Sequence, residues 1–272
     1  MRDSAAHLFA RLVEIVRVLR SPEGCPWDRA QTLASLKPFV LEEAYEVLEA
    51  IDGADQRALG EEIGDLIFEG VLLAQLGTER GEFTVTDALR SVVDKLVRRH
   101  PHVFGDAVRA STPEEVLGRW EEVKARERSD AASTKTTLSG IPKTLPGLLR
   151  AWEMGTRAAA VGFDWERASD VLGKIEEEVA ELRQAVERDP AAGRDEIELE
   201  MGDLLFAIAN LSRKLGIEPE AALRRANDKF TRRFTALERR ILERGGALQQ
   251  TPLDAMEVEW ERIKGEEDGG DQ

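Results

Sequence analysis

The sequence carries the same ordered series of motifs in each half, and this internal repeat limits the possible folds more than any other feature. Each half begins with Gly-x-x-Trp, followed by paired glutamates, Glu-x-x-Asp-Leu, Lys-x-x-Arg-Arg and Trp-x-x-x-Lys. These motifs start at Gly24, Glu42, Glu62, Lys95 and Trp120 in the first half, and at Gly162, Glu177, Glu200, Lys229 and Trp260 in the second. Because chance would not keep so many motifs in one order, the repeat predicts two copies of a single module.

Both modules are predicted to be helical. Strand signals are nearly absent, since β-branched residues do not alternate with polar ones and no Asn-Gly or Asp-Gly turn joins two such runs. Apolar residues recur instead with the spacing of a helix, for example at Leu8, Leu12, Ile15 and Leu19. The predicted fold class is therefore all-α, with two tandem helical-bundle modules.

The helical spacing lapses in one segment between the modules. From about Ser129 to Gly147 the sequence is rich in Ser, Thr, Pro and Gly, which is typical of a linker. A chain of 272 residues, 42% of them hydrophobic, is long enough for two domains of ordinary size. We predict an N-terminal module at residues 1–128, a linker at 129–147 and a C-terminal module at 148–272.

The net charge of −15 argues against non-specific binding to nucleic acid, because most of the surface would repel its phosphates. We therefore expect no nucleic-acid partner. A phosphorylated small molecule can still be a substrate, provided that local lysines and arginines or a bound divalent cation offset its charge.

A cytoplasmic location is expected from the cysteine content and the lack of long apolar segments. Cys25 is the single cysteine, so no intrachain disulfide can form. The first residues lead into no apolar run like that of a signal sequence, and no stretch approaches the roughly 18 apolar residues of a spanning helix. The amphipathic segment at residues 8–19 has a polar side of mixed charge, which favours packing in a core over lying on a membrane. We expect no membrane partner.

Paired carboxylates are the strongest indication of chemistry. Residues three apart share a helix face, so Glu43 with Glu46, and Glu62 with Asp65, each place two carboxylates side by side. If the two short-connected helices pack antiparallel, all four converge, and such a cluster needs a cation or partial protonation. The second module repeats the pattern, so the predicted metal ligands are Glu43, Glu46, Glu62 and Asp65, and Glu178, Glu181, Glu200 and Asp203.

Magnesium is the expected ion, with Mn²⁺ as a substitute, because it prefers carboxylate and water oxygens and completes its shell with substrate phosphates. The three histidines lie outside these motifs, which argues against the Glu-x-x-His pairs of di-iron bundles. The competing interpretation is that the glutamates are solvated faces of acidic helices.

Basic pairs at helical spacing are candidates for binding phosphate. Lys229 with Arg233, and Lys95 with Arg99, are four residues apart and share a face. Either pair can neutralise phosphate oxygens, or can belong to an ordinary basic helix surface. The repeated tryptophans, Trp120 and Trp260 among them, either stack on a base or fill a core.

The motif series resembles the MazG family of tandem-domain nucleoside triphosphate pyrophosphohydrolases, within the all-α NTP pyrophosphatase superfamily. The resemblance covers nearly the whole chain. Besides the paired carboxylate motifs, it rests on the segments at residues 24–28, 98–104, 161–165 and 227–234, which read GCPWD, RRHPHVF, VGFDW and NDKFTRRF.

The resemblance implies Mg²⁺-dependent hydrolysis of a nucleoside triphosphate to a monophosphate and pyrophosphate, in a homodimer formed through helices. It implies substrate contacts from Lys174, Glu177, Lys229, Arg233 and Trp260. By the internal repeat, Lys95, Arg99 and Trp120 are the matching first-module candidates. The catalytic candidates are Glu177, Glu178, Lys229 and Arg233. Water would attack the α-phosphorus, oriented or deprotonated by Glu177 or by a cluster carboxylate. Glu196 stands where the family can carry a lysine, so a contact from that position is not expected.

The second module is expected to be the main catalytic one. Pro101 should end the first basic helix near Arg99, because proline disfavours helical geometry in the preceding residue. The sequence after Arg233 lets the second basic helix continue, which gives its cations a more rigid support. The expected role is house-cleaning or regulation of the nucleotide pool. The alternatives are a narrower, dUTPase-like or phosphoribosyl-ATP-specific pyrophosphatase, and a non-enzymatic acidic helical interaction protein.

Overall fold

The computed structural model describes residues 4–105, 112, 136–188 and 193–269. Every regular element within these ranges is helical, and none is a strand. The chain divides into two units, Met1–Ala125 and Arg126–Gln272, which are described separately below. Trp120 and the first part of the predicted linker, residues 129–135, lie outside the described residues.

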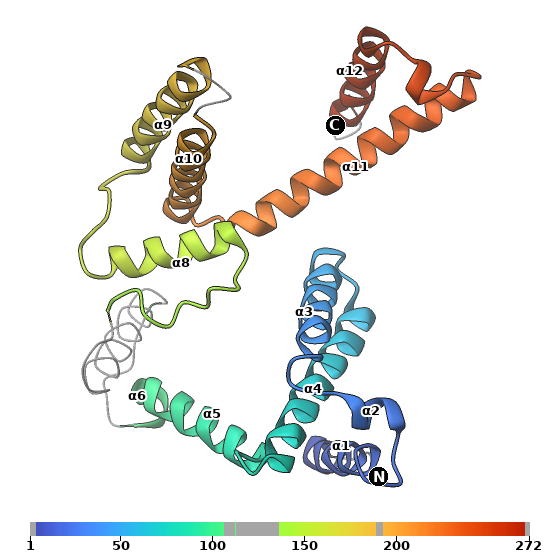
Figure 1. Cartoon of the computed structure of the whole chain (residues 1–272), viewed down its shortest axis with the longest axis vertical. Helices are drawn as coiled ribbons and strands as arrows, with labels where there is room; N and C mark the ends of the chain where they lie inside the picture. The colour runs from blue at the N-terminus through green and yellow to red at the C-terminus, as the bar shows by residue number, and fades with distance from the viewer. Residues whose placement is uncertain (1–3, 106–111, 113–135, 189–192, 270–272) are drawn as a thin grey trace. The chain divides into compact units, whose positions relative to one another are not determined.

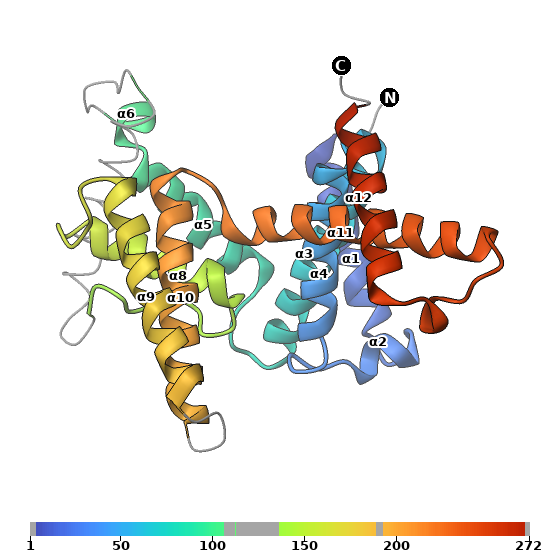
Figure 2. The ribbon, with the colours of Figure 1, turned by 90° about the horizontal axis from the view of Figure 1, so that it is seen from above.

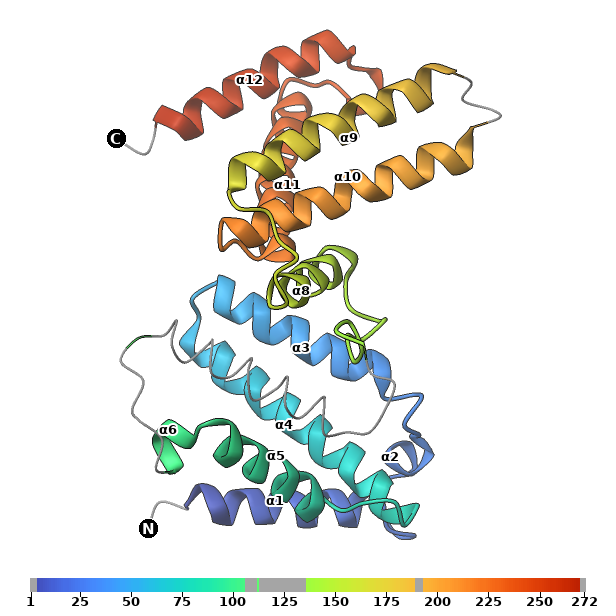
Figure 3. The ribbon, with the colours of Figure 1, turned by 90° about the vertical axis from the view of Figure 1, so that its left-hand side faces the viewer.

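The first unit is built around one helical hairpin, α3 and α4, which Figure 3 shows running side by side. Helix α1 packs against α4, and the core between them contains the buried side chains of Val16, Leu72 and Leu76. The helices of this unit are α1 (Ala5–Leu19), α2 (Pro26–Ala30), α3 (Lys37–Asp52), α4 (Gln56–Glu79), α5 (Val85–Arg99) and α6 (Pro101–Phe104) (Figure 1).

Local sequence signals explain where these helices begin and end. The Asp55 side chain accepts hydrogen bonds from the backbone N–H groups of Arg57 and Ala58 and so caps α4. Thr84 and Asp87 form a capping box at the start of α5. Helix α5 ends at Arg99, which confirms the predicted effect of Pro101.

The second unit repeats the hairpin as α9 and α10 and adds a helical pair, α11 and α12. Figure 2 shows α9 and α10 side by side. Helix α8 packs against α10 and α11, and α11 also contacts α12. Helix α11 runs without interruption through Lys229 and Arg233, as the sequence predicts. The elements are α8 (Gly147–Ala159), α9 (Ala168–Arg188), α10 (Arg194–Lys214), α11 (Pro219–Glu243), the 3₁₀ helix η1 (Leu248–Gln250) and α12 (Leu253–Gly269).

Helix α8 approaches α10 closely because residue 155 is a glycine. A Cβ atom at Gly155 would overlap the Oδ1 atom of Asn210, which is buried on α10. The Asn210 amide is held in place, donating to the Phe206 carbonyl and accepting from Arg213 Nε. This contact fixes α8 on the hairpin that carries the second carboxylate motifs.

Apolar side chains remain exposed on the hairpin helices of a single chain. On α9 they recur every seven residues, at Leu172, Val179 and Val186. In the first unit Leu41 and Tyr45 of α3 are similarly exposed. Within the described residues, no helix combines the length and the apolar character that crossing a membrane requires.

Candidate metal centre and phosphate-binding residues

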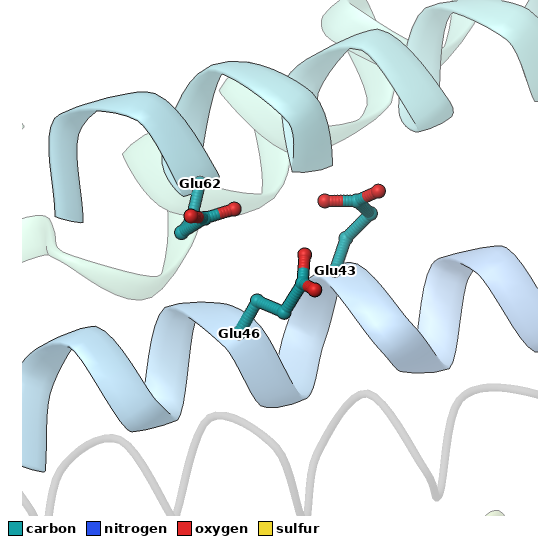
Figure 4. Close-up of side chains that lie close together, drawn as sticks. All are labelled: Glu43, Glu46 and Glu62. Atoms are coloured by element: carbon teal, nitrogen blue, oxygen red, sulfur yellow. The ribbon is translucent and has the colours of Figure 1, made fainter. Parts of the chain in front are cut away.

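The α3–α4 hairpin brings three first-module carboxylates together. Glu43 and Glu46 project from α3 and Glu62 from α4 into the space between the helices (Figure 4). One carboxylate oxygen of each lies within 4.8 Å of the others. Asp65, the fourth predicted ligand, lies outside this close group, although its charge helps raise the pKa of Glu43 and Glu62.

The electrostatics of this cluster favour a bound cation. Burial raises the pKa of Glu43, and the charges of Glu46, Asp65 and Glu62 raise it further. Burial and the neighbouring Glu46 and Asp65 likewise raise the pKa of Glu62. The Oε2 atom of Glu43 is buried without a hydrogen-bond partner. A divalent cation would satisfy this oxygen and relieve the repulsion.

The α9–α10 hairpin forms the matching cluster from Glu178, Glu181 and Glu200, again with one oxygen of each within 4.8 Å of the others. Burial raises the pKa of Glu200, and so do the charges of Glu181, Glu178 and Asp203. Glu178 is 4% exposed, and its Oε2 atom has no hydrogen-bond partner. Asp203 lies outside the close group, as Asp65 does in the first module.

The donor set of both clusters fits a hard divalent cation. All of the convergent atoms are carboxylate oxygens, which are ligands that Mg²⁺ and Mn²⁺ accept. Each cluster also contains a buried oxygen without a protein partner, on Glu43 or on Glu178. The residues present therefore fit the ion that the sequence predicts.

Among the described residues, a lysine contacts the second cluster and none contacts the first. Lys174 Nζ lies 2.8 Å from Glu177 Oε1 and 2.8 Å from Glu178 Oε1. Lys174 precedes Glu178 by four residues. The residue four before Glu43 in the first module is Phe39, which packs against the hydrophobic core. The two clusters therefore have similar ligands but different counter-charges.

The other predicted substrate contacts of the second module lie on α11 and α12. Arg233 Nε donates to Glu267 Oε2 at 2.7 Å, and the Trp260 ring lies 5.5 Å from the Phe230 ring, centroid to centroid. Lys229 is exposed. Among the described residues, no hydrogen bond or ion pair joins Lys229, Arg233 or Trp260 to the carboxylate cluster.

Ion pairs of the buried Glu259 with Arg240 and Arg244 join α12, which carries Trp260, to α11. Glu259 is 3% exposed and accepts hydrogen bonds from Arg240, Arg244 and Arg262. The bonds from Arg244 and Arg240 hold the pKa of Glu259 below its usual range.

The first-module candidates for phosphate binding are arranged differently. Lys95 is exposed on α5, and Arg99 is the last residue of that helix. Trp120 falls outside the part of the chain that the structure describes. The described residues therefore do not assemble a first-module equivalent of the α11–α12 pair.

An apolar pocket of about 330 Å³ lies beside the second hairpin. Phe163 and Trp165 line it from the segment before α9, and Phe206 lines it from α10, one turn after Asp203. Asp164 pairs with Arg213 and Lys214, which ties this segment to the end of α10. Trp165, whose role the sequence leaves open, is thus in the wall of a pocket.

Sequence reasoning missed one carboxylate next to the first cluster. Glu69 is 5% exposed, and its Oε2 atom has no hydrogen-bond partner. Burial raises its pKa, and the charges of Glu43 and Asp28 add to the shift. Glu69 follows Asp65 by four residues and Glu62 by seven, so all three lie on one face of α4. This spacing could have predicted Glu69 as a neighbour of the cluster.

Comparison with known proteins agrees with this duplicated arrangement. The model of the MazG nucleotide pyrophosphohydrolase domain matches the chain twice, at residues 31–104 and 168–236. The nucleoside triphosphate pyrophosphohydrolase/pyrophosphatase MazG of Thermotoga maritima is 44% identical over 261 residues, which are 96% of this chain and 97% of that protein. The nucleoside triphosphate pyrophosphohydrolase of Escherichia coli K12 is 45% identical over 258 residues, 94% of this chain and 97% of that protein.

A solved structure is also similar to part of the chain. It is the crystal structure of a mazG-related protein from Thermotoga maritima, with 33% sequence identity and a TM-score of 0.37, and it covers 43% of this chain and 98% of that one. The two domain matches and the near full-length identity to two relatives decide the assignment. The chain belongs to the MazG family of nucleotide pyrophosphohydrolases.

Proposed function

We propose that this protein hydrolyses nucleoside triphosphates, with ribose or deoxyribose, to the nucleoside monophosphate and pyrophosphate, and that it requires Mg²⁺ or Mn²⁺. The observation that carries the proposal is the carboxylate cluster of Glu178, Glu181 and Glu200, in a chain of the MazG family. The near full-length relatives named as nucleoside triphosphate pyrophosphohydrolases support the same reaction.

The residues of the second module divide into three roles. Glu178, Glu181, Glu200 and Asp203 would hold the metal ion, which when bound offsets phosphate charge and polarises the phosphate. Lys174, Lys229 and Arg233 would bind phosphate oxygens, and Trp260 would contact the nucleoside. Glu177 or a cluster carboxylate would orient the attacking water and accept its proton. We assign residues 148–272 as the main catalytic module, 1–128 as the N-terminal module and 129–147 as the linker.

Product analysis tests the reaction. Turnover of a triphosphate should give equal amounts of monophosphate and pyrophosphate, and in ¹⁸O-labelled water the label should enter the monophosphate alone. Release of orthophosphate and a diphosphate would contradict the assignment.

The metal requirement is tested in the same assay. Activity should be absent in excess chelator and restored by Mg²⁺ or Mn²⁺. Ca²⁺ should support it poorly, because its longer bonds and looser geometry position phosphate less well. Full activity in chelator would overturn the metal requirement.

We also propose that the protein is a homodimer acting on the cytoplasmic nucleotide pool. The exposed apolar stripe of Leu172, Val179 and Val186 on α9 supports self-association, since a seven-residue repeat is the spacing of packed helix seams. The single cysteine fits a reducing compartment. Cell fractionation followed by immunodetection tests the location.

A further inference from the structure

Lys174 is a counter-charge of the second carboxylate cluster. Its ammonium group contacts Glu177 and Glu178 at 2.8 Å each, one turn along the same helix. The hydrogen bonds that Lys174 donates to these two carboxylates raise its pKa, so the side chain remains charged. The Lys174 side chain is 36% exposed and has a flexible four-carbon stem, so its ammonium can move to another partner.

The two carboxylate oxygens of Glu178 have different surroundings. Its Oε1 atom is bound by Lys174, whereas its Oε2 atom is buried and has no partner. Glu181 and Glu200 place carboxylate oxygens within 4.8 Å of a Glu178 oxygen. A divalent cation in this cluster would therefore meet a glutamate whose charge is already partly neutralised.

Among the described residues of the first module, no lysine contacts the carboxylate cluster. Phe39 takes the equivalent position, packs on the core and lies edge-on to Trp27 at 5.7 Å between ring centroids. The Oε2 atom of Glu43 is buried and has no hydrogen-bond partner. The charged neighbours that shift the pKa of Glu43 are all acidic and raise it. A cation that enters this cluster would displace no counter-charge supplied by the described residues.

We infer that Lys174 is an exchangeable counter-cation, which holds Glu178 in the free protein and transfers to the triphosphate when metal and nucleotide bind together. The inference rests on the proposed function and adds an order of binding to it. The second module should bind a divalent cation weakly by itself and tightly together with a nucleotide. The first module should bind the same cation without any nucleotide.

Binding of Mn²⁺ to the full chain tests the first half of this inference, with the electron paramagnetic resonance signal of free Mn²⁺ as the readout. Glu43→Gln and Glu62→Gln are placed in every protein, so that the second cluster is the one counted. Adding Lys174→Met should tighten Mn²⁺ binding on the order of tenfold, because the competing ammonium is gone. Lys143→Met, which removes an exposed lysine of the segment before α8, is the matched control and should change nothing.

Binding of α,β-methylene-ATP tests the second half, measured by isothermal titration with and without excess Mn²⁺. In the parent protein Mn²⁺ should strengthen binding of the analogue, and in the Lys174→Met protein that gain should fall on the order of tenfold. Lys174→Arg, which retains the charge, should restore most of the gain. Circular dichroism of each variant establishes that it is folded.

The outcomes separate this inference from the proposed function. Unchanged or weaker Mn²⁺ binding in Lys174→Met, with analogue binding intact, would overturn the exchange and make Lys174 a fixed support of Glu178. An analogue that binds none of the folded proteins would overturn the nucleotide function instead.

Discussion

Glu178 and Glu43 occupy matching positions in the two modules but have different surroundings. Glu178 is buried and paired with Lys174, whereas Glu43 is only half-buried and has Phe39 one turn before it. The basic helix after the second cluster also continues for ten residues beyond Arg233, to Glu243, while α5 ends at Arg99. From these differences we propose that the two clusters support catalysis unequally.

We therefore expect Glu178→Gln or Asp203→Asn to remove nearly all activity, and Glu43→Gln or Asp65→Asn to leave most of it. Pyrophosphate release at saturating Mg²⁺ measures the effect, with circular dichroism as the control for folding. Equal losses from both sets of substitutions in folded protein would show that both modules are catalytic.

The charge of Glu200 should make stability depend on pH. Burial and the acidic neighbours raise the pKa of Glu200 above its ordinary value of 4.5 in the folded chain. Its contribution to stability is therefore fully present below pH 4.5 and is lost as the pH rises through the folded-state value. Glutamine cannot ionise, so the Glu200→Gln variant does not lose this stability as the pH rises. In chelator, the difference in melting temperature between Glu200→Gln and the parent should therefore increase with pH over this range.

Differential scanning calorimetry from pH 4 to 8 measures this difference. Glu198→Gln, an exposed substitution on the same helix, is the control and should show no such trend. A difference that stays flat or falls with rising pH would mean that repulsion in the cluster does not act on Glu200.

The clustering of glutamates in the candidate site could be predicted from their spacing, but the ion pairs of the other candidate residues could be predicted only in part. Glu43, Glu46 and Glu62 lie close together because i, i+3 spacing and a short-connected hairpin suffice to place them. The contact of Lys174 with Glu178 is likewise local, at four residues. The pair of Arg233 with Glu267 spans 34 residues and depends on how α12 folds back along α11, which no local pattern specifies.

The helices and the end of α5 before Pro101 were predicted from the sequence, whereas close contacts between helices were not. Pro101 and the Thr84–Asp87 box specify ends of α5 by local chemistry. Gly155 has no such local signature, because a glycine inside a helical pattern looks only unfavourable. Its role is seen once α8 lies on Asn210 of α10.

Two glycine substitutions in the second unit test this packing. Gly155→Ala should destabilise the unit by about 1–3 kcal/mol, because the added methyl group overlaps Asn210. Gly173→Ala on α9 meets no atom within 4 Å and should instead stabilise by up to about 1 kcal/mol, since alanine favours helix. Urea unfolding of both variants gives the comparison. Equal effects of the two substitutions would remove the packing role of Gly155.

The apolar stripe on α9 remains exposed to solvent in a single chain. Leu172, Val179 and Val186 are 49%, 39% and 47% exposed. A solvent-exposed seam of this kind is unfavourable unless another surface covers it. Sequence periodicity predicted the helix but could not say what covers the stripe.

Sedimentation equilibrium should give twice the chain mass of 30.3 kDa. Leu172→Glu combined with Val186→Glu should shift the protein towards the monomer, because charges on the stripe would be buried in the interface. Arg188→Glu, on the opposite side of α9, is the control and should leave the mass unchanged. A monomer at all concentrations would contradict the homodimer.

If Arg233 binds substrate phosphate as proposed, the Glu267 carboxylate would compete with the substrate for it. A phosphate that binds Arg233 must first displace the Glu267 carboxylate, 2.7 Å from Nε. Glu267→Gln should therefore lower the KM for nucleotide roughly two- to tenfold with little change in kcat. Steady-state kinetics measures this, with Glu257→Gln as an exposed control on the same helix. If KM is unchanged, the pair does not compete; if it falls, fusions or truncations at this terminus will alter substrate affinity without touching the catalytic residues.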